Sequence, residues 1–125
     1  MRLRLLGGLA YVAGEVVHGG RVLRVENLLV DTGSAGTVFS ADLLLELGIA
    51  PEPSDRLLRV RGVGGTEFVF TKVLSALTVG DLAVMRFRVQ VGALDYGFPL
   101  DGILGLDFLR ATKAKLDFDA LELST

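Results

Sequence analysis

Apolar residues occur along the chain in short runs separated by glycine-rich turns, a pattern typical of β-strands joined by tight connections. The first two runs, Leu9–Val17 and Arg21–Val30, lie on either side of a turn at His18–Gly20. Both contain many β-branched residues and leucines, which suit strands that pack on a core. The pattern therefore predicts a β-hairpin whose second strand ends directly before Asp31.

A second hairpin is predicted around a glycine-rich sequence in the middle of the chain. Its arms are Arg56–Arg61 and Thr66–Val73, and its tip consists of Gly62, Val63, Gly64 and Gly65. The remaining strands are expected at Ser75–Val79, Leu82–Val91, Lys113–Phe118 and Ala120–Ser124, the last two as a terminal hairpin or a bent strand.

Two short helices are expected between these strands. Ser40 is a candidate N-cap for a helix over Ala41–Leu47, and Gly48 stands just beyond its end. A second helix is expected over Leu106–Arg110. We therefore expect an all-β fold with one or two short helices, in a single domain that spans residues 1–125.

Composition supports this interpretation and excludes several partners. The chain has 125 residues, of which 50% are hydrophobic and 22% charged, so it is long enough and apolar enough to bury a core. The net charge is −2 and the basic residues are scattered, which excludes the basic patch of a nucleic-acid-binding protein. The N-terminal apolar run Leu5–Ala13 is interrupted by glycines and favours a strand over a secretory leader. No apolar stretch approaches the ~20 residues of a membrane-spanning helix, so we expect no membrane partner and a cytoplasmic location.

The chain also lacks the side chains that most catalytic sites use. Without cysteine there is no thiol nucleophile or thiolate metal site, and His18 is the only histidine. One histidine cannot form a His-based metal site, and we interpret Asp101 and Asp107 as turn and helix-start residues. We therefore expect neither a metal nor a cofactor.

The strongest candidate for chemistry is the sequence Leu29-Val30-Asp31-Thr32-Gly33-Ser34, in which a strand runs directly into an Asp-Thr-Gly turn. Further along, a second apolar run meets the turn Asp101-Gly102-Ile103-Leu104-Gly105, and the glycine-rich tip at residues 62–65 lies between the two. Taken alone, Asp31 would be read as a residue that caps a β-turn. The three elements in this order resemble the retropepsin-like aspartic proteases, and the resemblance covers nearly the whole chain.

This resemblance implies a homodimeric barrel of short strands and a role for each element. It makes Asp31 the catalytic carboxylate, with Thr32 supporting the turn and Gly33 allowing close backbone approach. Ser34 and Ala35 would face the substrate, Gly62–Gly65 would form the flap that closes over it, and Ile103, Leu104 and Gly105 would support the turn from beneath. Ser34 stands where retroviral enzymes have alanine, and a hydroxyl that donates to ionised Asp31 would favour an acid-leaning pH optimum.

The chain contains one Asp-Thr-Gly sequence, and the chemistry needs two carboxylates. Peptide hydrolysis without a metal or covalent nucleophile uses a pair of carboxylates about 3 Å apart that share one proton. The second carboxylate must therefore come from another copy of the chain, so that activity requires a symmetric homodimer. Whether the terminal segments Met1–Leu6 and Leu121–Thr125 interleave in that dimer is left open by the sequence.

Three functions are compatible with these features. The leading interpretation is a homodimeric aspartic endopeptidase acting on extended polypeptides. The alternative is a non-catalytic peptide-binding or dimerisation module on the same scaffold. A nucleotide-binding protein that uses the glycine-rich tip is disfavoured, because no Lys-Ser/Thr follows the tip and Glu67 beside it would repel phosphate.

Overall fold

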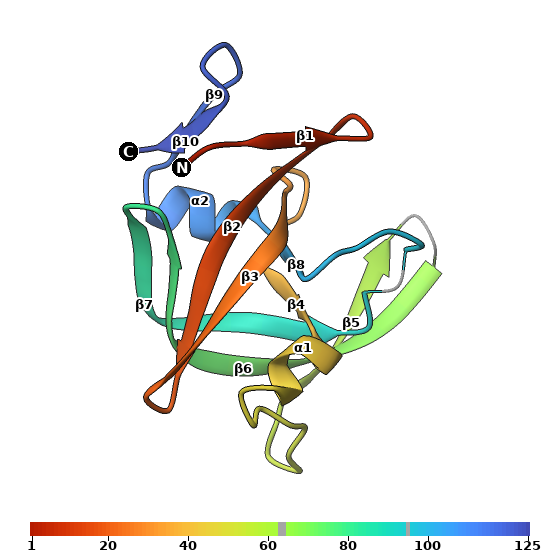
Figure 1. The fold of residues 1–125 in the computed structure, drawn as a ribbon. Helices are drawn as coiled ribbons and strands as arrows, with labels where there is room; N and C mark the ends of the chain where they lie inside the picture. The colour runs from red at the N-terminus through yellow and green to blue at the C-terminus, as the bar shows by residue number, and fades with distance from the viewer. Residues whose placement is uncertain (63–64, 95) are drawn as a thin grey trace.

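A computed structural model describes residues 1–62, 65–94 and 96–125 of the chain. The described residues form ten strands and two short helices (Figure 1). In chain order these are β1 (Arg4–Leu6), β2 (Leu9–His18), β3 (Arg21–Val30), β4 (Val38–Ser40), α1 (Ala41–Leu45), β5 (Leu57–Gly62), β6 (Gly65–Val79), β7 (Leu82–Gly92), β8 (Gly102–Leu104), α2 (Leu106–Ala111), β9 (Lys115–Asp117) and β10 (Glu122–Ser124).

Eight of these strands form one sheet that closes on itself. Their order is β1-β2-β3-β8-β4-β7-β6-β5, and an additional pairing of β2 with β6 completes a barrel. Most neighbours are antiparallel, whereas β3–β8 and β4–β7 are parallel. The parallel β3–β8 pair brings residues 102–104 next to β3, the strand that leads into Asp31, and β4 lies on the other side of β8.

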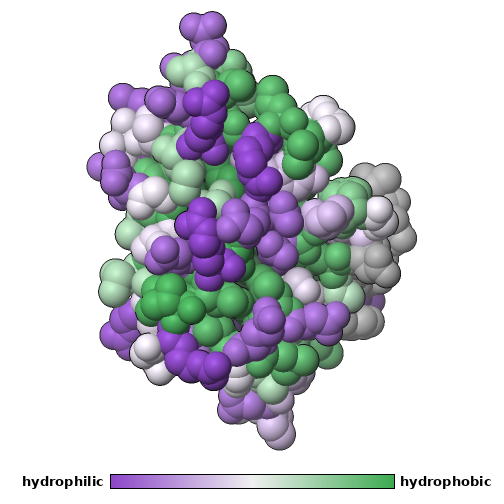
Figure 2. Space-filling view, in the orientation of Figure 1, coloured by the Kyte–Doolittle hydropathy of each residue, from purple (hydrophilic) through white to green (hydrophobic). Residues whose placement is uncertain are grey.

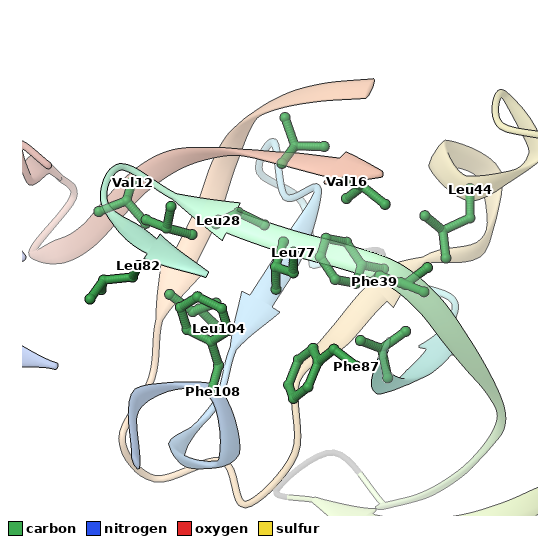
Figure 3. Packing of buried hydrophobic residues seen from close by; sticks show 14 of the residues in the cluster. Val12, Val16, Leu28, Phe39, Leu44, Leu77, Leu82, Phe87, Leu104 and Phe108 are labelled. Carbon is green, nitrogen blue, oxygen red and sulfur yellow. The ribbon is translucent and has the colours of Figure 1, made fainter. Parts of the chain in front are cut away.

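The interior of the barrel is filled by aliphatic and aromatic side chains from nearly every element (Figure 3). The rings of Phe87 and Phe108 meet edge to face, with centroids 5.8 Å apart, which ties α2 to β7. Residues with no exposed surface include Val12, Val16, Leu28, Phe39, Leu44, Leu74, Leu77, Leu104 and Phe108. Because Leu28 and Leu104 lie on β3 and β8, this core fixes the base of the Asp31 turn.

Several expected elements are confirmed. The first hairpin is formed by β2 and β3, and β9 pairs with β10 as the terminal hairpin. The Ser40 hydroxyl accepts a hydrogen bond from the Leu43 N–H at 3.4 Å, as expected of an N-cap. Gly48 adopts φ +74° just beyond the first helix, where an L side chain would be strained.

Other boundaries differ from expectation. The first helix ends at Leu45 and not at Leu47, because residues 46–48 turn to pair their N–H groups with its last carbonyls. The segments expected as separate strands at Thr66–Val73 and Ser75–Val79 form the single strand β6. Ser75 does not break it, since its exposed side chain fits the outer face while Leu74 and Ala76 are buried.

The first and last residues of the chain pair with each other. The Leu3 N–H donates to Leu121 O at 2.9 Å, the Leu123 N–H donates to Met1 O at 2.7 Å, and Arg2 bridges Glu122. The terminal strand β10 thus has the N-terminal residues on one side and β9 on the other. Among the described residues, no helix has the length and apolar character to cross a membrane.

Candidate active site

The Asp31 turn begins where β3 leaves the barrel. The Asp31 N–H donates to Leu104 O at 3.0 Å, which continues the parallel β3–β8 pairing by one residue. The half-buried carboxylate accepts a hydrogen bond from the Gly33 N–H at 2.9 Å through Oδ1. The Ser34 N–H closes the turn on Asp31 O at 3.2 Å. The carboxylate is therefore held by its own turn at the end of a strand anchored in the core.

The residues that follow Asp31 differ in exposure. Thr32, Gly33 and Ala35 are exposed, whereas Ser34 is half-buried. The Ser34 hydroxyl donates to Gly36 O at 2.8 Å. A hydroxyl has one proton to donate, so the expectation that Ser34 donates to Asp31 is wrong. The tight turn places the Gly36 carbonyl within reach first, so the Ser34 hydroxyl gives Asp31 no hydrogen bond that would favour an acid-leaning pH optimum.

Strand β8 and the residue after it lie directly against this turn. Ile103 pairs with Leu29 and Leu104 with Val30 in the parallel register. At Gly105 there is no room for a side chain, because a Cβ there would lie 2.5 Å from Gly36 O. The structure thus brings all three of the predicted supporting residues next to the Asp31 turn.

A buried hydrogen-bond network locks the turn to α2. The Thr37 side chain is fully buried, and its hydroxyl donates to Asp107 Oδ1 at 2.7 Å. The Thr37 hydroxyl oxygen also accepts a hydrogen bond from the Gly105 N–H at 3.0 Å. The Thr37 N–H donates to Asp107 Oδ2 at 3.1 Å. Sequence reasoning placed Asp107 at a helix start and missed this link. The sequence carries no signal for it, because the two residues become neighbours only when β8 pairs with β3.

Asp101 also does more than occupy a turn. Its carboxylate accepts hydrogen bonds from the N–H groups of Glu26 and Asn27, at 3.2 and 3.0 Å. These residues lie where the β2–β3 register shifts between Val12 and Gly14, so their N–H groups leave the regular ladder. Asp101 therefore accepts the N–H groups that the bulge leaves unpaired in β3, the strand that leads into Asp31.

The second hairpin provides the arms of the expected flap. Strands β5 and β6 pair up to Gly62 and Gly65, and in Figure 1 they extend away from the body of the barrel. Val63 and Gly64, the other two residues of the predicted tip, lie outside the described residues. The structure therefore places the two ends of the tip, with Gly62 opposite Gly65.

A hollow of about 370 Å³ lies between the Asp31 turn and the flap arms. Gly36 and Thr37 line one side, and Leu58 of β5 lines the other, with β7 as the floor. Sequence reasoning did not assign Leu58 or Gln90 to a site, because their approach to the turn depends on how the hairpin folds over the barrel. The remaining lining residues are Thr71, Phe87, Arg88, Val89, Gln90 and Asp107.

An ion-pair cluster anchors the chain segment that leads into β5. Lys72 Nζ lies 2.8 Å from Glu52 Oε1 and 2.9 Å from Asp55 Oδ2, and the Lys72 and Asp55 side chains are each only 11% exposed. Burial opposes ionisation of Asp55, but the hydrogen bond and charge of Lys72, with the Glu52 N–H, outweigh it and hold the Asp55 pKa below its usual 3.8. Burial likewise opposes the charge of Lys72, but Glu52 and Asp55 raise the Lys72 pKa.

The lowered pKa of Asp55 predicts how the ion-pair cluster's contribution to stability changes with pH. Because the folded-state pKa of Asp55 lies below its usual 3.8, the carboxylate stabilises the fold above that pH and loses its contribution as the pH falls through the folded value. Unfolding of wild type and Asp55→Asn should therefore differ at pH 5–7 and converge below the folded pKa. Denaturant titrations across that range measure this, with exposed Asp42→Asn as control, and a pH-independent difference would contradict it.

The Thr37 network makes a second prediction. Thr37→Val keeps the shape of the side chain but leaves the buried Gly105 N–H without its acceptor, and should lower the free energy of unfolding by about 2 kcal/mol. Thr112→Val is the matched control, because the carbonyls that its hydroxyl contacts also accept backbone hydrogen bonds. Denaturant unfolding of both variants tests this. Equal losses in the free energy of unfolding would show that the Thr37 network adds nothing to stability.

No group of three His, Asp or Glu side chains gathers as a metal site would require, within the part of the chain that the structure describes.

Comparisons with known proteins agree with this geometry. A family model described as Aspartyl protease matches residues 13–108. Among solved structures, the fold is similar to that of a retropepsin-like aspartic protease from Rickettsia conorii, with a TM-score of 0.68 and 19% sequence identity over 94% of this chain and 83% of that one. No curated protein sequence matches the chain. The predicted retropepsin-like, mostly β fold with two short helices is confirmed.

Proposed function

The chain belongs to the aspartyl protease family, and from this premise we propose that it is a homodimeric endopeptidase that hydrolyses peptide bonds of extended polypeptides. The observation that carries the proposal is the position of Asp31. Its half-buried carboxylate follows a core strand and is held by the Gly33 N–H, and Gly36 and Thr37, which come directly after the turn, line the hollow beside the β5–β6 hairpin. A carboxylate built into a fixed turn suits proton transfer better than one on a mobile surface loop.

In the proposed reaction, Asp31 of one chain is ionised and the same residue of a second copy is protonated. The ionised carboxylate removes a proton from a water molecule as the water oxygen bonds to the peptide carbon, and the protonated carboxyl donates its proton to the carbonyl oxygen. The tetrahedral diol then collapses: the carboxylate that gave up its proton takes one from a diol hydroxyl, the other carboxyl donates the proton it took from water to the amide nitrogen, and the C–N bond breaks. The two carboxylates together hold one proton before and after the cycle.

The neighbouring residues take supporting roles in this proposal. Thr32 stabilises the paired turns, and Gly33 leaves space for the second copy beside the carboxylate. The Ser34 and Ala35 backbone and the flap residues Gly62–Gly65 provide hydrogen-bond partners for a peptide bound in extended form. The hollow lined by Leu58 and Gln90 receives a substrate side chain. Ile103, Leu104 and Gly105 keep the turn in place and do not touch the substrate.

The test is cleavage of an unfolded polypeptide library at pH 4–7, with and without a statine-type inhibitor that mimics the tetrahedral diol. We expect cleavage that the inhibitor blocks and whose rate per chain rises with protein concentration, because two copies form one site. Peptide binding without cleavage would favour the non-catalytic module instead. Cleavage that persists with saturating inhibitor would contradict the proposed mechanism.

A further inference from the structure

A second hollow of about 370 Å³ opens on the other side of the Asp31 turn. Thr32 lines it, and its apolar lining comes from α2, from Ala114 in the segment leading into β9, and from Leu116 of β9 itself. Leu106 is 39% exposed there, whereas Leu109 is buried. Two exposed cations, Arg110 and Lys113, line it as well. The hollow thus combines an apolar floor with two positive charges directly beside the catalytic turn.

The β9–β10 hairpin carries the opposite combination. Phe118 is 64% exposed, and it stands between Asp117 and Asp119, which are both exposed. Asp117 Oδ1 accepts the N–H groups of Asp119 and Ala120, each at 2.9 Å, and so fixes the turn. In Figure 1 this hairpin projects beyond the barrel, and Figure 2 shows that its outermost part is hydrophilic. The hairpin thus presents an aromatic ring, flanked by two carboxylates, to the solvent.

We propose that the hollow beside Thr32 is the docking site for Phe118 of a second copy, exchanged reciprocally about a two-fold axis. The Phe118 ring enters the apolar floor, and the flanking carboxylates of Asp117 and Asp119 meet Arg110 and Lys113. The inference rests on the proposed function, because a second copy that brings its Asp31 to the same axis must lie against Thr32. The same contact then serves twice in one dimer.

The backbone at Lys113 supports this assignment. Lys113 adopts φ +53° at the end of α2, where its N–H donates to Arg110 O at 3.1 Å and the Ala114 N–H donates to Leu109 O at 2.9 Å. Helices that end in this left-handed conformation usually have glycine at the position, because an L side chain is strained there. The left-handed turn at Lys113 ends α2 at the hollow, and the exposed Lys113 side chain lines it.

The pairing of the chain ends points to side-chain exchange as the means of contact. Strand β10 is flanked by β9 on one side and by residues 1–3 of the same chain on the other. Neither edge of β10 is open to a strand from a second copy. Contact with a second copy at β10 is thus left to side chains, and the exposed Phe118 ring in the β9–β10 turn is an aromatic side chain that can make it.

The first experiment measures the dimer dissociation constant by analytical ultracentrifugation. Phe118→Ala should raise it by about 30-fold or more, as expected for a buried aromatic anchor. Val22→Ala is the control, since Val22 is 60% exposed at the start of β3, far along that strand from Asp31, and should leave the constant unchanged. A monomeric wild-type chain, or equal effects of the two variants, would overturn the inference.

The second experiment exchanges the charges. Lys113→Glu and Asp119→Lys should each weaken self-association, because each places like charges face to face in both contacts of the dimer. In an equimolar mixture, the carboxylate introduced at 113 faces the ammonium introduced at 119, and the second contact keeps its native pair, so association should return to within a few-fold of wild type. Failure of the mixture to recover would overturn the contact.

These readouts do not depend on proteolysis. Charge-exchange rescue without any cleavage would retain the interface and refute the proposed enzyme function. If a dimer cleaves peptides in an inhibitor-sensitive way but its dissociation constant does not respond to Phe118→Ala or to the charge exchange, the enzyme function is retained and the proposed interface is refuted.

Discussion

Asp31→Asn should lower the rate of peptide hydrolysis by about 10³-fold or more while leaving the free energy of unfolding nearly unchanged. The asparagine side chain keeps an oxygen that can accept the Gly33 N–H, so the turn survives. An amide cannot take a proton from water or return one to the leaving nitrogen. In a homodimer the substitution removes both carboxylates at once, and for this reason we expect it to have the largest effect on activity.

The measurement is the initial rate of cleavage of an unfolded polypeptide, with thermal unfolding of the same samples. Asp81→Asn is the matched control, since Asp81 is exposed in the β6–β7 turn and its change should leave the rate within about twofold. Cleavage by Asp31→Asn at the wild-type rate would show that another residue is the catalyst.

Gly105→Ala should lower the free energy of unfolding by about 3 kcal/mol, the largest loss of stability that we expect from a single methyl group. The new Cβ would lie 2.5 Å from Gly36 O and 2.9 Å from Ser34 O, both of which are backbone atoms of the turn. Backbone held by β8 and α2 cannot move aside as a flexible side chain can. Activity should fall with stability, because the atoms that must shift belong to the Asp31 turn.

Gly36→Ala is the matched control for this prediction. Its Cβ would also have a close neighbour, at 2.9 Å, but that atom is Nε2 at the end of the flexible Gln90 side chain. The amide can rotate away, so we expect a loss below about 1 kcal/mol. Denaturant unfolding of the two variants measures the difference, and equal losses would show that the turn yields as easily as a side chain.

The sequence predicts those features that depend on local pattern. The strand that ends at Asp31, the Ser40 cap, and the left-handed Gly48 follow from residues within a few positions of each other. The supporting position of Ile103–Gly105 could be anticipated because the resemblance to a family supplied the pairing that the local pattern does not contain. The first three of these predictions need no knowledge of which segments meet in space.

The features that the sequence did not predict depend on contacts between distant segments. The Thr37–Asp107 pair forms across 70 residues, and neither residue type signals its partner. The predicted hydrogen bond from Ser34 to Asp31 is absent for a geometric reason, because the Ser34 hydroxyl donates to the Gly36 carbonyl in its own turn. The prediction ends one strand at Val73 and begins another at Ser75, whereas β6 is continuous there and exposed Ser75 faces outward. Each depends on backbone placement that a linear pattern does not give.

The parallel pairing of β3 with β8 has a consequence for how the molecule folds. Residues 28–30 meet residues 102–104 in this pairing, so most of the chain must be in place before the Asp31 turn gains its Leu104 partner. Contacts between segments so far apart form slowly, because the intervening loop must be closed first. We therefore expect the Asp31 turn to become ordered late in folding. A chain still emerging from the ribosome would form its early hairpins before residues 102–104 can pair with β3, so the proposed activity would have to wait until those residues have been made.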